Sequence, residues 1–276
     1  MKQSLLLIAL LIGFGARAQQ YYKDILNIRS TNQKQVIFQK NKVKKIQFNS
    51  FDGDHQPIEG FQSVQTISRD FMELTTRTNT SLIGATMSIF WFNKQLQLVQ
   101  SLDSSDDAST TLSYEYDGKG NITAIKSTTT SAGDFKITED HLWTYNANGK
   151  PLSMLKIKNS KDTTYYSFVL DEKGNVVEEN GTYKGKSIPS IYYYYDEQNN
   201  LTDIVRYNIA AKRLLPIYVF EYENGRLATM MVVPEEGTDY QKWYYSYDED
   251  GLKLLDACYS KTKVMIGSVE YGYENY

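Results

Sequence analysis

Residues 192–201 read YYYYDEQNNL, four tyrosines followed by a short polar stretch and a leucine. Tyrosine is frequent throughout the chain, with 23 residues of 276 against only 5 prolines. Aromatic side chains favour the pleated, half-buried surface of a β-sheet, and tyrosine suits a sheet face with one apolar side and one wet edge. The stretch therefore predicts a β-strand that ends in a turn.

The same pattern recurs from residue 112 towards the C-terminus at intervals of about 25 residues. Each copy has an alternating, aromatic-rich segment, then an acid or asparagine, then glycine or asparagine, and then an aliphatic residue. An internal repeat of this kind predicts one supersecondary unit per copy. The copies are LSYEYDGKGNITAIK (112–126), LWTYNANGKPLSMLK (142–156), YSFVLDEKGNVVEEN (166–180), YYYYDEQNNLTDIVR (192–206), VFEYENGRLATMMV (219–232) and YYSYDEDGLKLLDA (244–257).

Each copy predicts a β-hairpin. Because successive strand side chains alternate between faces, the two aromatic residues of a pair share one face. Glycine or asparagine supplies the left-handed backbone of the turn. The predicted turn positions are Gly120, Gly149, Gly174, Asn199, Gly225 and Gly251. The predicted aromatic ladder, which is the candidate binding face, consists of Tyr114, Tyr116, Trp143, Tyr145, Tyr193, Tyr195, Phe220, Tyr222, Trp243, Tyr245 and Tyr247.

Chained hairpins predict an all-β fold, an antiparallel β-hairpin repeat array whose long meander sheet is curled and open. Sheets of this length twist strongly and tend to curl or split, although a flat layer and a closed barrel stay open as alternatives. The hairpin repeats occupy residues 90–276. Residues 19–89 are expected to be a β-rich capping region with less regular repeats. There, YYKDILNIR (21–29) predicts a short helical cap, and VIFQKNKVKKIQF (36–48) predicts a hairpin that turns at residues 40–42.

The first 18 residues, MKQSLLLIALLIGFGARA, predict a signal peptide that is cleaved after Ala18. Lys2 supplies the positive start, and Ala16-Arg17-Ala18 is a small-x-small cleavage site. The alternative is an anchored N-terminal helix, but the apolar run is roughly half of the ~20 residues that span a bilayer. We expect an exported protein, periplasmic or at the cell surface, with no transmembrane segment in the mature chain.

Without Lys2 and Arg17 the chain carries 28 basic and 33 acidic side chains, a net charge of −5. This balance argues against nucleic acid, and against an anionic membrane surface, as the main partner. A single cysteine, Cys258, provides no disulfide framework. In the apolar stretch LLDACYS it is expected to be a buried small hydrophobe, with an intermolecular or reactive thiol as the alternative.

The repeated pattern Y-x-Y-D-x-x-G-x-(L/I/V) resembles the YD repeats of the Rhs family, which also occur in teneurins. The resemblance covers about residues 90–276. It implies a long antiparallel sheet that coils, in large members, into a hollow shell. With about six to eight units, the chain has no room for the toxin domain of those members. It resembles small exported YD-repeat proteins of Bacteroidetes, for which the family implies no activity.

The sequence gives little support for catalytic or metal sites. His55 and His141 are the only histidines, and no His-x-x-x-His or Cys-x-x-Cys spacing occurs. Acid clusters at 52–54, 103–107 and 248–250 fit turn chemistry, with a loosely bound cation as the alternative. Pairs such as Glu139/Asp140 are consecutive strand residues that point to opposite faces, so such a pair alone does not make a glycosidase. We therefore predict no catalytic residue, no metal and no cofactor.

These observations favour an exported, non-enzymatic binding or scaffold module at the cell envelope. Its aromatic ladder would meet a glycan or an envelope protein, unless rings such as Trp143 and Trp243 pack the interior of a curled sheet. The alternative is a polysaccharide-acting hydrolase, which requires acids that converge on the sheet face with perturbed pKa values. A third function is structural, with a neighbouring molecule completing the sheet at the edge strand that ends at Tyr276.

Overall fold

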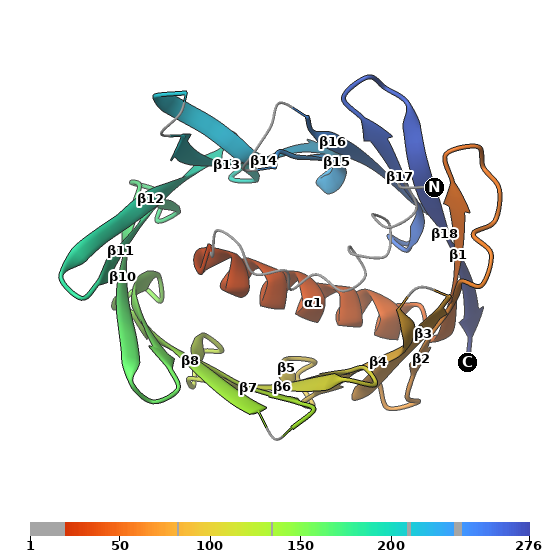
Figure 1. Ribbon diagram of the computed structural model, residues 1–276, viewed down its shortest axis with the longest axis horizontal. Helices are drawn as coiled ribbons and strands as arrows, with labels where there is room; N and C mark the ends of the chain where they lie inside the picture. The colour runs from red at the N-terminus through yellow and green to blue at the C-terminus, as the bar shows by residue number, and fades with distance from the viewer. Residues whose placement is uncertain (1–19, 82, 134, 209–210, 235–238) are drawn as a thin grey trace.

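A computed structural model describes residues 20–276 except 82, 134, 209–210 and 235–238. The predicted signal peptide, residues 1–18, lies outside the described residues. Eighteen strands form one antiparallel sheet that closes into a barrel, and the helix α1 (Tyr22–Lys40) lies inside it (Figure 1). The fold is therefore all-β apart from an N-terminal helix.

The strands follow one another around the barrel in chain order, each hydrogen-bonded to the next. They are β1 (Val43–Asp52), β2 (Gln62–Ile67), β3 (Glu73–Thr80), β4 (Gly84–Phe92), β5 (Leu98–Ser104), β6 (Ala108–Tyr116), β7 (Ile122–Ser131), β8 (Phe135–Tyr145), β9 (Pro151–Lys158), β10 (Asp162–Leu170), β11 (Val176–Tyr183), β12 (Lys186–Tyr195), β13 (Leu201–Asn208), β14 (Arg213–Glu223), β15 (Arg226–Val232), β16 (Gln241–Tyr247), β17 (Lys253–Ser260) and β18 (Met265–Asn275).

In five of the six repeats an acid or asparagine side chain holds the turn. Asp117 Oδ1 accepts hydrogen bonds of 2.8 Å from the backbone N–H groups of Lys119 and Asn121. This local bonding explains why the repeat needs Asp or Asn at that place. The equivalent bond to the residue four positions on is made by Asn146, Asp171, Asp196 and Asp248. The φ angles of Gly120, Gly149, Gly174, Asn199, Gly225 and Gly251 lie between +63° and +87°, in the left-handed region.

The second tyrosine of several aromatic pairs ties its strand to the neighbouring strand. Tyr145 Oη donates a 2.7 Å hydrogen bond to the carbonyl oxygen of Ile122, the first residue of β7. Because each such bond joins the end of one strand to the start of its neighbour, it fixes the register of the pair. The same bond joins Tyr116 to Leu98, Tyr195 to Val176, and Tyr273 to Lys253.

The sheet closes where β1 meets β18. The two strands pair from Val43↔Asn275 to Asp52↔Gly267, and β1 also pairs with β2. The prediction of an open, curled array is therefore wrong. Hairpin repeats specify only contacts between neighbouring strands, whereas closure joins segments that are distant in the chain. The strand that precedes Tyr276 is not an edge, because β17 and β1 flank it.

Helix α1 is longer than the predicted cap at residues 21–29, and the predicted hairpin at 36–48 is wrong before residue 41. Val36 and Phe38 are spaced like residues on one face of a strand, but both lie on the helix. Of these two side chains, Phe38 is buried and Val36 is exposed. The helix ends at Asn41, whose side-chain Nδ2 donates to the Ile37 carbonyl at 3.0 Å. No helix in the described part of the chain is long and apolar enough to cross a membrane.

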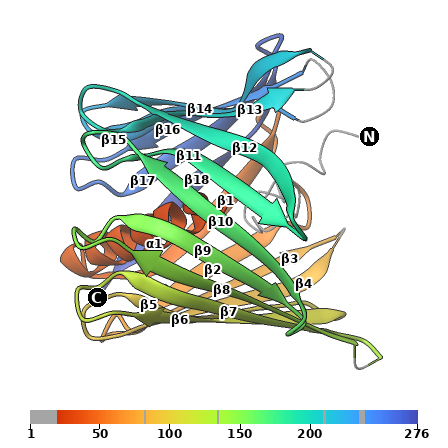
Figure 2. The ribbon, with the colours of Figure 1, turned by 90° about the vertical axis from the view of Figure 1, so that its left-hand side faces the viewer.

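The barrel has two chemically distinct ends. We call the end with the repeat turns and the C-terminus the repeat rim, and α1 lies across the barrel near this end (Figure 2). Two hydrogen bonds hold α1 there, from Gln35 Nε2 to the Phe71 carbonyl (2.7 Å) and from the Leu98 N–H to Asn32 Oδ1 (2.9 Å). The opposite end, which we call the far rim, carries the tips of hairpins such as β7–β8, β9–β10, β11–β12 and β13–β14.

The outer wall carries ion pairs as well as exposed tyrosines, among them Tyr165 and Tyr194. Lys45 of β1 pairs with Glu274 of β18 at 2.7 Å, and Lys242 of β16 reaches Glu221 at 2.9 Å. On the lipid-facing wall of a transmembrane barrel, each lysine near the bilayer midplane would cost about 2–4 kcal/mol. These ion pairs therefore fit a wall that contacts water where they lie.

Replacing Tyr145 by Phe removes the bond to the Ile122 carbonyl and keeps the ring. We expect the free energy of unfolding in urea to fall by about 1 kcal/mol, because a buried acceptor loses its donor. Tyr165→Phe is the matched control, because its side chain is exposed, and it should change stability by less than about 0.5 kcal/mol. Equal losses in the two variants would contradict the role of the bond.

Candidate functional site

The predicted aromatic ladder lines the inner wall of the barrel. Tyr193, Trp243 and Trp143 are 1 %, 3 % and 4 % exposed. Tyr193 meets Tyr22 of α1 edge-on, with ring centroids 5.3 Å apart. A ligand would therefore have to enter the barrel to reach these rings, and their binding role stays a prediction. Of the other ladder residues, Tyr114 is buried, and Tyr116, Tyr145, Tyr195, Phe220, Tyr222, Tyr245 and Tyr247 are half-buried.

A carboxylate of the barrel wall forms hydrogen bonds with the N-terminal end of α1. Glu179 of β11 accepts the backbone N–H groups of Tyr21 and Tyr22, each at 3.0 Å, and the Tyr193 hydroxyl at 2.7 Å. The helix has no capping side chain of its own, so Glu179 satisfies free donors at its positive end. Burial raises the pKa of Glu179, although its three hydrogen bonds oppose that shift.

A second group of charges joins α1 to β8 and β9. His141 Nδ1 lies 2.9 Å from Asp24 Oδ2, and His141 Nε2 lies 2.9 Å from Glu139 Oε1. Lys156 Nζ lies 2.8 Å from Glu139 Oε2 and 2.8 Å from Tyr21 Oη. Together with Glu179, these residues connect the first turn of α1 to three strands. We call the set Tyr21, Asp24, Glu139, His141, Lys156 and Glu179 the helix latch.

The charges of the helix latch stabilise one another. Burial alone would lower the pKa of His141, but its bonds to Asp24 and Glu139 outweigh burial and raise it to about 9. Burial would raise the pKa of Glu139, but His141 and Lys156 bring it down to about 2. Perturbed pKa values often mark active sites. Here each shifted group is already hydrogen-bonded within the latch, so the arrangement holds the helix.

The sequence pattern and the strand register explain why Glu139, His141 and Lys156 of the helix latch lie together. Glu139 and Asp140 are neighbours and point to opposite faces, but Glu139 and His141 are two residues apart and share one. Lys156 lies directly opposite His141 in the register of β8 and β9. No sequence pattern predicts that Asp24 lies beside His141, because this contact depends on the path of α1 through the barrel.

The remaining predicted candidates have structural surroundings. His55 stacks on Phe51, with ring centroids 4.6 Å apart, in the loop after β1. Cys258 is a buried free thiol whose pKa burial raises to about 12. Asp52 and Asp248 each accept a backbone N–H of their own turn. Within the described residues, no cluster of three or more His, Cys, Asp or Glu side chains could hold a metal ion.

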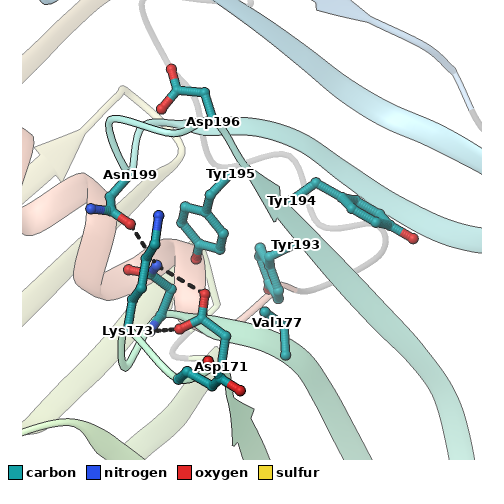
Figure 3. A pocket seen from close by; sticks show the side chains of 10 residues that line it. Asp171, Lys173, Val177, Tyr193, Tyr194, Tyr195, Asp196 and Asn199 are labelled. Atoms are coloured by element: carbon teal, nitrogen blue, oxygen red, sulfur yellow. Dashed lines mark hydrogen bonds between the residues drawn. The ribbon is translucent and has the colours of Figure 1, made fainter.

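A pocket opens at the repeat rim between the β10–β11 and β12–β13 turns (Figure 3). Its volume of about 360 Å³ lies in the range of small-molecule sites. The pocket brings together three residues that the sequence singles out, namely Tyr193, Tyr195 and Asn199. We call it the rim pocket, and it is lined by Asp171, Glu172, Lys173, Asn175, Val177, Tyr193, Tyr194, Tyr195, Asp196 and Asn199.

Hydrogen bonds fix the polar groups of the rim pocket. Asn175 Nδ2 donates to Asp171 Oδ2 and to Asn199 Oδ1, both at 3.1 Å, and so bridges the two turns. Burial tends to raise the pKa of Asp171, but its bonds from Asn175 lower it overall. The side-chain bond from Asn200 lowers the pKa of Asp196. The pocket therefore presents carboxylates, amides and a tyrosine ring on a fixed frame.

Comparisons with known proteins give distant likenesses. No protein-family model and no curated protein matches the chain. A porin-like protein from Bacteroides uniformis is 10 % identical, with a TM-score of 0.42 over 85 % of this chain and 97 % of that one. A porin-like protein from Bacteroides vulgatus is 13 % identical, with a TM-score of 0.26 over 85 % and 99 %. A common fold is not established at these TM-scores, so function has to be argued from the residues of this chain.

The resemblance to YD-repeat proteins of the Rhs family is not upheld. No family model supports it, and the sheet closes on itself around a helix instead of forming an open repeat array. The Y-x-Y-D-x-x-G pattern has a local cause, since it combines an acid-capped turn with a tyrosine tie between neighbouring strands. Such a motif suits any antiparallel sheet and does not identify a family.

We expect His141 and Glu139 of the helix latch to make the free energy of unfolding fall on both sides of a mildly acidic pH range. Since the pKa of His141 rises from 6.5 to about 9 on folding, its contribution is complete below pH 6.5 and is lost towards pH 9. Since the pKa of Glu139 falls from 4.5 to about 2, its contribution is complete above pH 4.5 and is lost towards pH 2. Urea unfolding at a series of pH values measures both slopes.

Between pH 6.5 and 9, the wild-type protein should lose more stability than His141→Gln, which cannot titrate there. His55→Gln removes the loop histidine and should keep the wild-type slope. Parallel curves for the wild-type protein and His141→Gln would show that the latch does not couple folding to protonation.

Proposed function

We propose that this protein is an exported, non-enzymatic glycan-binding module that recognises its ligand in the rim pocket. The proposal rests on one observation. The Tyr195 ring lines the same pocket as polar side chains of two neighbouring turns, among them Asp171 and Asn199. Aromatic rings stack on the apolar faces of sugars, while carboxylates and amides accept and donate hydrogen bonds to hydroxyl groups.

The size and rigidity of the rim pocket suit a small part of a glycan. Its volume of about 360 Å³ is at the lower end for ligand sites and fits one or two sugar rings. The bridge of Asn175 between the two turns keeps the polar groups in place before the ligand arrives. Such preorganisation reduces the ordering cost of binding.

The alternative function, a polysaccharide-acting hydrolase, fits the acids less well. A glycosidase needs one carboxylic acid with a raised pKa beside a second, ionised carboxylate. The pKa values of Asp171 and Asp196 are both lowered by hydrogen bonds. Glu179 has the raised pKa, but it is 2 % exposed and holds the start of α1. A binding role therefore fits these carboxylates better than a catalytic one.

In this proposal the barrel is a rigid support with its outer wall in water. The ion pairs Lys45–Glu274 and Lys242–Glu221 lie on that wall, and the helix latch holds α1 inside. This arrangement is compatible with a location at the cell envelope outside the hydrocarbon core of a membrane.

A glycan array followed by calorimetric titration tests the proposal. Lys173→Ala removes a cation that lines the rim pocket, and Asn199→Gly removes an amide while keeping the left-handed backbone. Each should weaken the affinity for the selected glycan about ten-fold, the effect of one lost hydrogen bond of about 1.4 kcal/mol. Lys119→Ala is the matched control, because Lys119 occupies the same place in the Asp117 turn.

An array without any bound glycan, or an equal loss in Lys119→Ala, would contradict the proposal. Release of reducing sugar from the bound glycan, if Asp171→Asn abolished it, would establish the hydrolase alternative instead.

A further inference from the structure

One stretch of the far rim carries a cluster of positive charge. At the repeat rim several turns are acidic, as in Asp171-Glu172, Asp196-Glu197 and Asp248-Glu249-Asp250. At the far rim, three consecutive hairpins, β9–β10, β11–β12 and β13–β14, end in exposed cations. We call these six side chains the basic arc, and they are Lys158, Lys161, Lys184, Lys186, Lys212 and Arg213.

Little negative charge offsets the basic arc. Asp162 is the acid at these three tips, and it lies 3.6 Å from Lys184 and accepts a hydrogen bond from Tyr183 Oη at 3.1 Å. Six cations therefore stand against one acid on a short stretch of rim. This stretch of the far rim therefore has a positive potential in a chain whose total charge is negative, whereas the far-rim loops at 52–59 and 105–107 carry acids.

Two of the cations occupy sterically unfavourable backbone positions. Lys184 and Lys212 have φ angles of +49° and +51°. At the predicted turns of the repeat rim, the left-handed position holds glycine or asparagine, which adopt that conformation more readily. Lys184 and Lys212 therefore adopt a backbone conformation that is unfavourable for lysine.

Large apolar side chains are exposed beside the basic arc. Phe135, at the adjacent β7–β8 tip, is 62 % exposed, and Leu214 follows Arg213 on β14 with 43 % exposure. On strands that run up to these tips, Tyr165 and Tyr207 are each 49 % exposed. Tyr207 and Leu214 are register partners, so their side chains lie on one face. The arc is thus cationic at its tips and apolar at its flanks.

We propose that the basic arc docks this protein peripherally on a bilayer surface with anionic headgroups. Lysine and arginine near such a surface are attracted to its negative potential. Aromatic and aliphatic side chains beside them can enter the boundary between headgroups and acyl chains. The acidic repeat rim would then face away from the membrane and leave the rim pocket accessible.

A lipid surface fits better than a soluble polyanion. A charged polymer would be satisfied by the cations alone, whereas Phe135 and Leu214 gain little from contact with hydrated sulfate or carboxylate groups. Insertion of these side chains would remove apolar surface from water. The inference concerns the end of the barrel opposite the rim pocket, so it is independent of glycan binding.

Sedimentation with vesicles tests the inference. The protein should bind vesicles of phosphatidylcholine mixed with phosphatidylglycerol, should not bind phosphatidylcholine alone, and should bind less as salt rises. Lys184→Gly/Lys212→Gly removes two charges and relieves the backbone, so it should fold at least as stably in urea. Its affinity for the mixed vesicles should nevertheless fall roughly ten-fold or more.

Lys94→Ala/Lys119→Ala makes the same charge change at the repeat rim and should bind mixed vesicles as the wild-type protein does. Phe135→Ser should weaken vesicle binding while leaving retention on dextran sulfate unchanged. Binding to dextran sulfate without binding to vesicles, or equal binding of the wild-type protein and Lys184→Gly/Lys212→Gly to mixed vesicles, would overturn the inference.

Discussion

The pairing of β1 with β18 is the constraint on which the rest of the structure depends. It turns a chain of hairpins into a closed wall and leaves no free sheet edge at Tyr276. A barrel of 18 strands is too wide for wall side chains alone to fill, in contrast to one of about eight strands. Helix α1 directly precedes β1, so the segment that occupies the interior is joined covalently to the strand that closes the wall.

Because α1 starts inside the barrel, the free backbone N–H groups at its N-terminus need hydrogen-bond acceptors from the wall. Glu179 receives the N–H groups of Tyr21 and Tyr22, and His141 binds Asp24. Buried charges of this kind contribute more to a unique arrangement than to net stability, since desolvation offsets much of their attraction. Apolar rings such as Tyr193 would accept a helix in several orientations. The helix latch favours one of these orientations. Its residues His141 and Glu139 have shifted pKa values, as residues in active sites often do.

The sequence predicts this structure well where the cause is local and poorly where it is not. The turns at Gly120 and Gly174 follow from an acid and a glycine a few residues apart, and those residues do have left-handed backbones. Closure, and the helix through residue 40, depend on contacts between distant segments. Phe38 shows the ambiguity, because an alternating apolar pattern over a few residues fits a strand or a helix. At the rim pocket, Tyr195 and Asn199 are visible in the repeat, but the neighbouring turn with Asp171 becomes a neighbour only through the sheet.

Net charge is misleading for a protein built in this way. Successive turns of an antiparallel barrel alternate between its two ends, so residues that alternate along the chain become segregated in space. The acids at Asp171 and Asp196 gather at one rim, while Lys184 and Lys212 gather at the other. A total of −5 for the chain without its first 18 residues averages over this separation. It argues against anionic partners for the molecule as a whole, yet a partner contacts only part of the surface, and at the basic arc the local charge is positive.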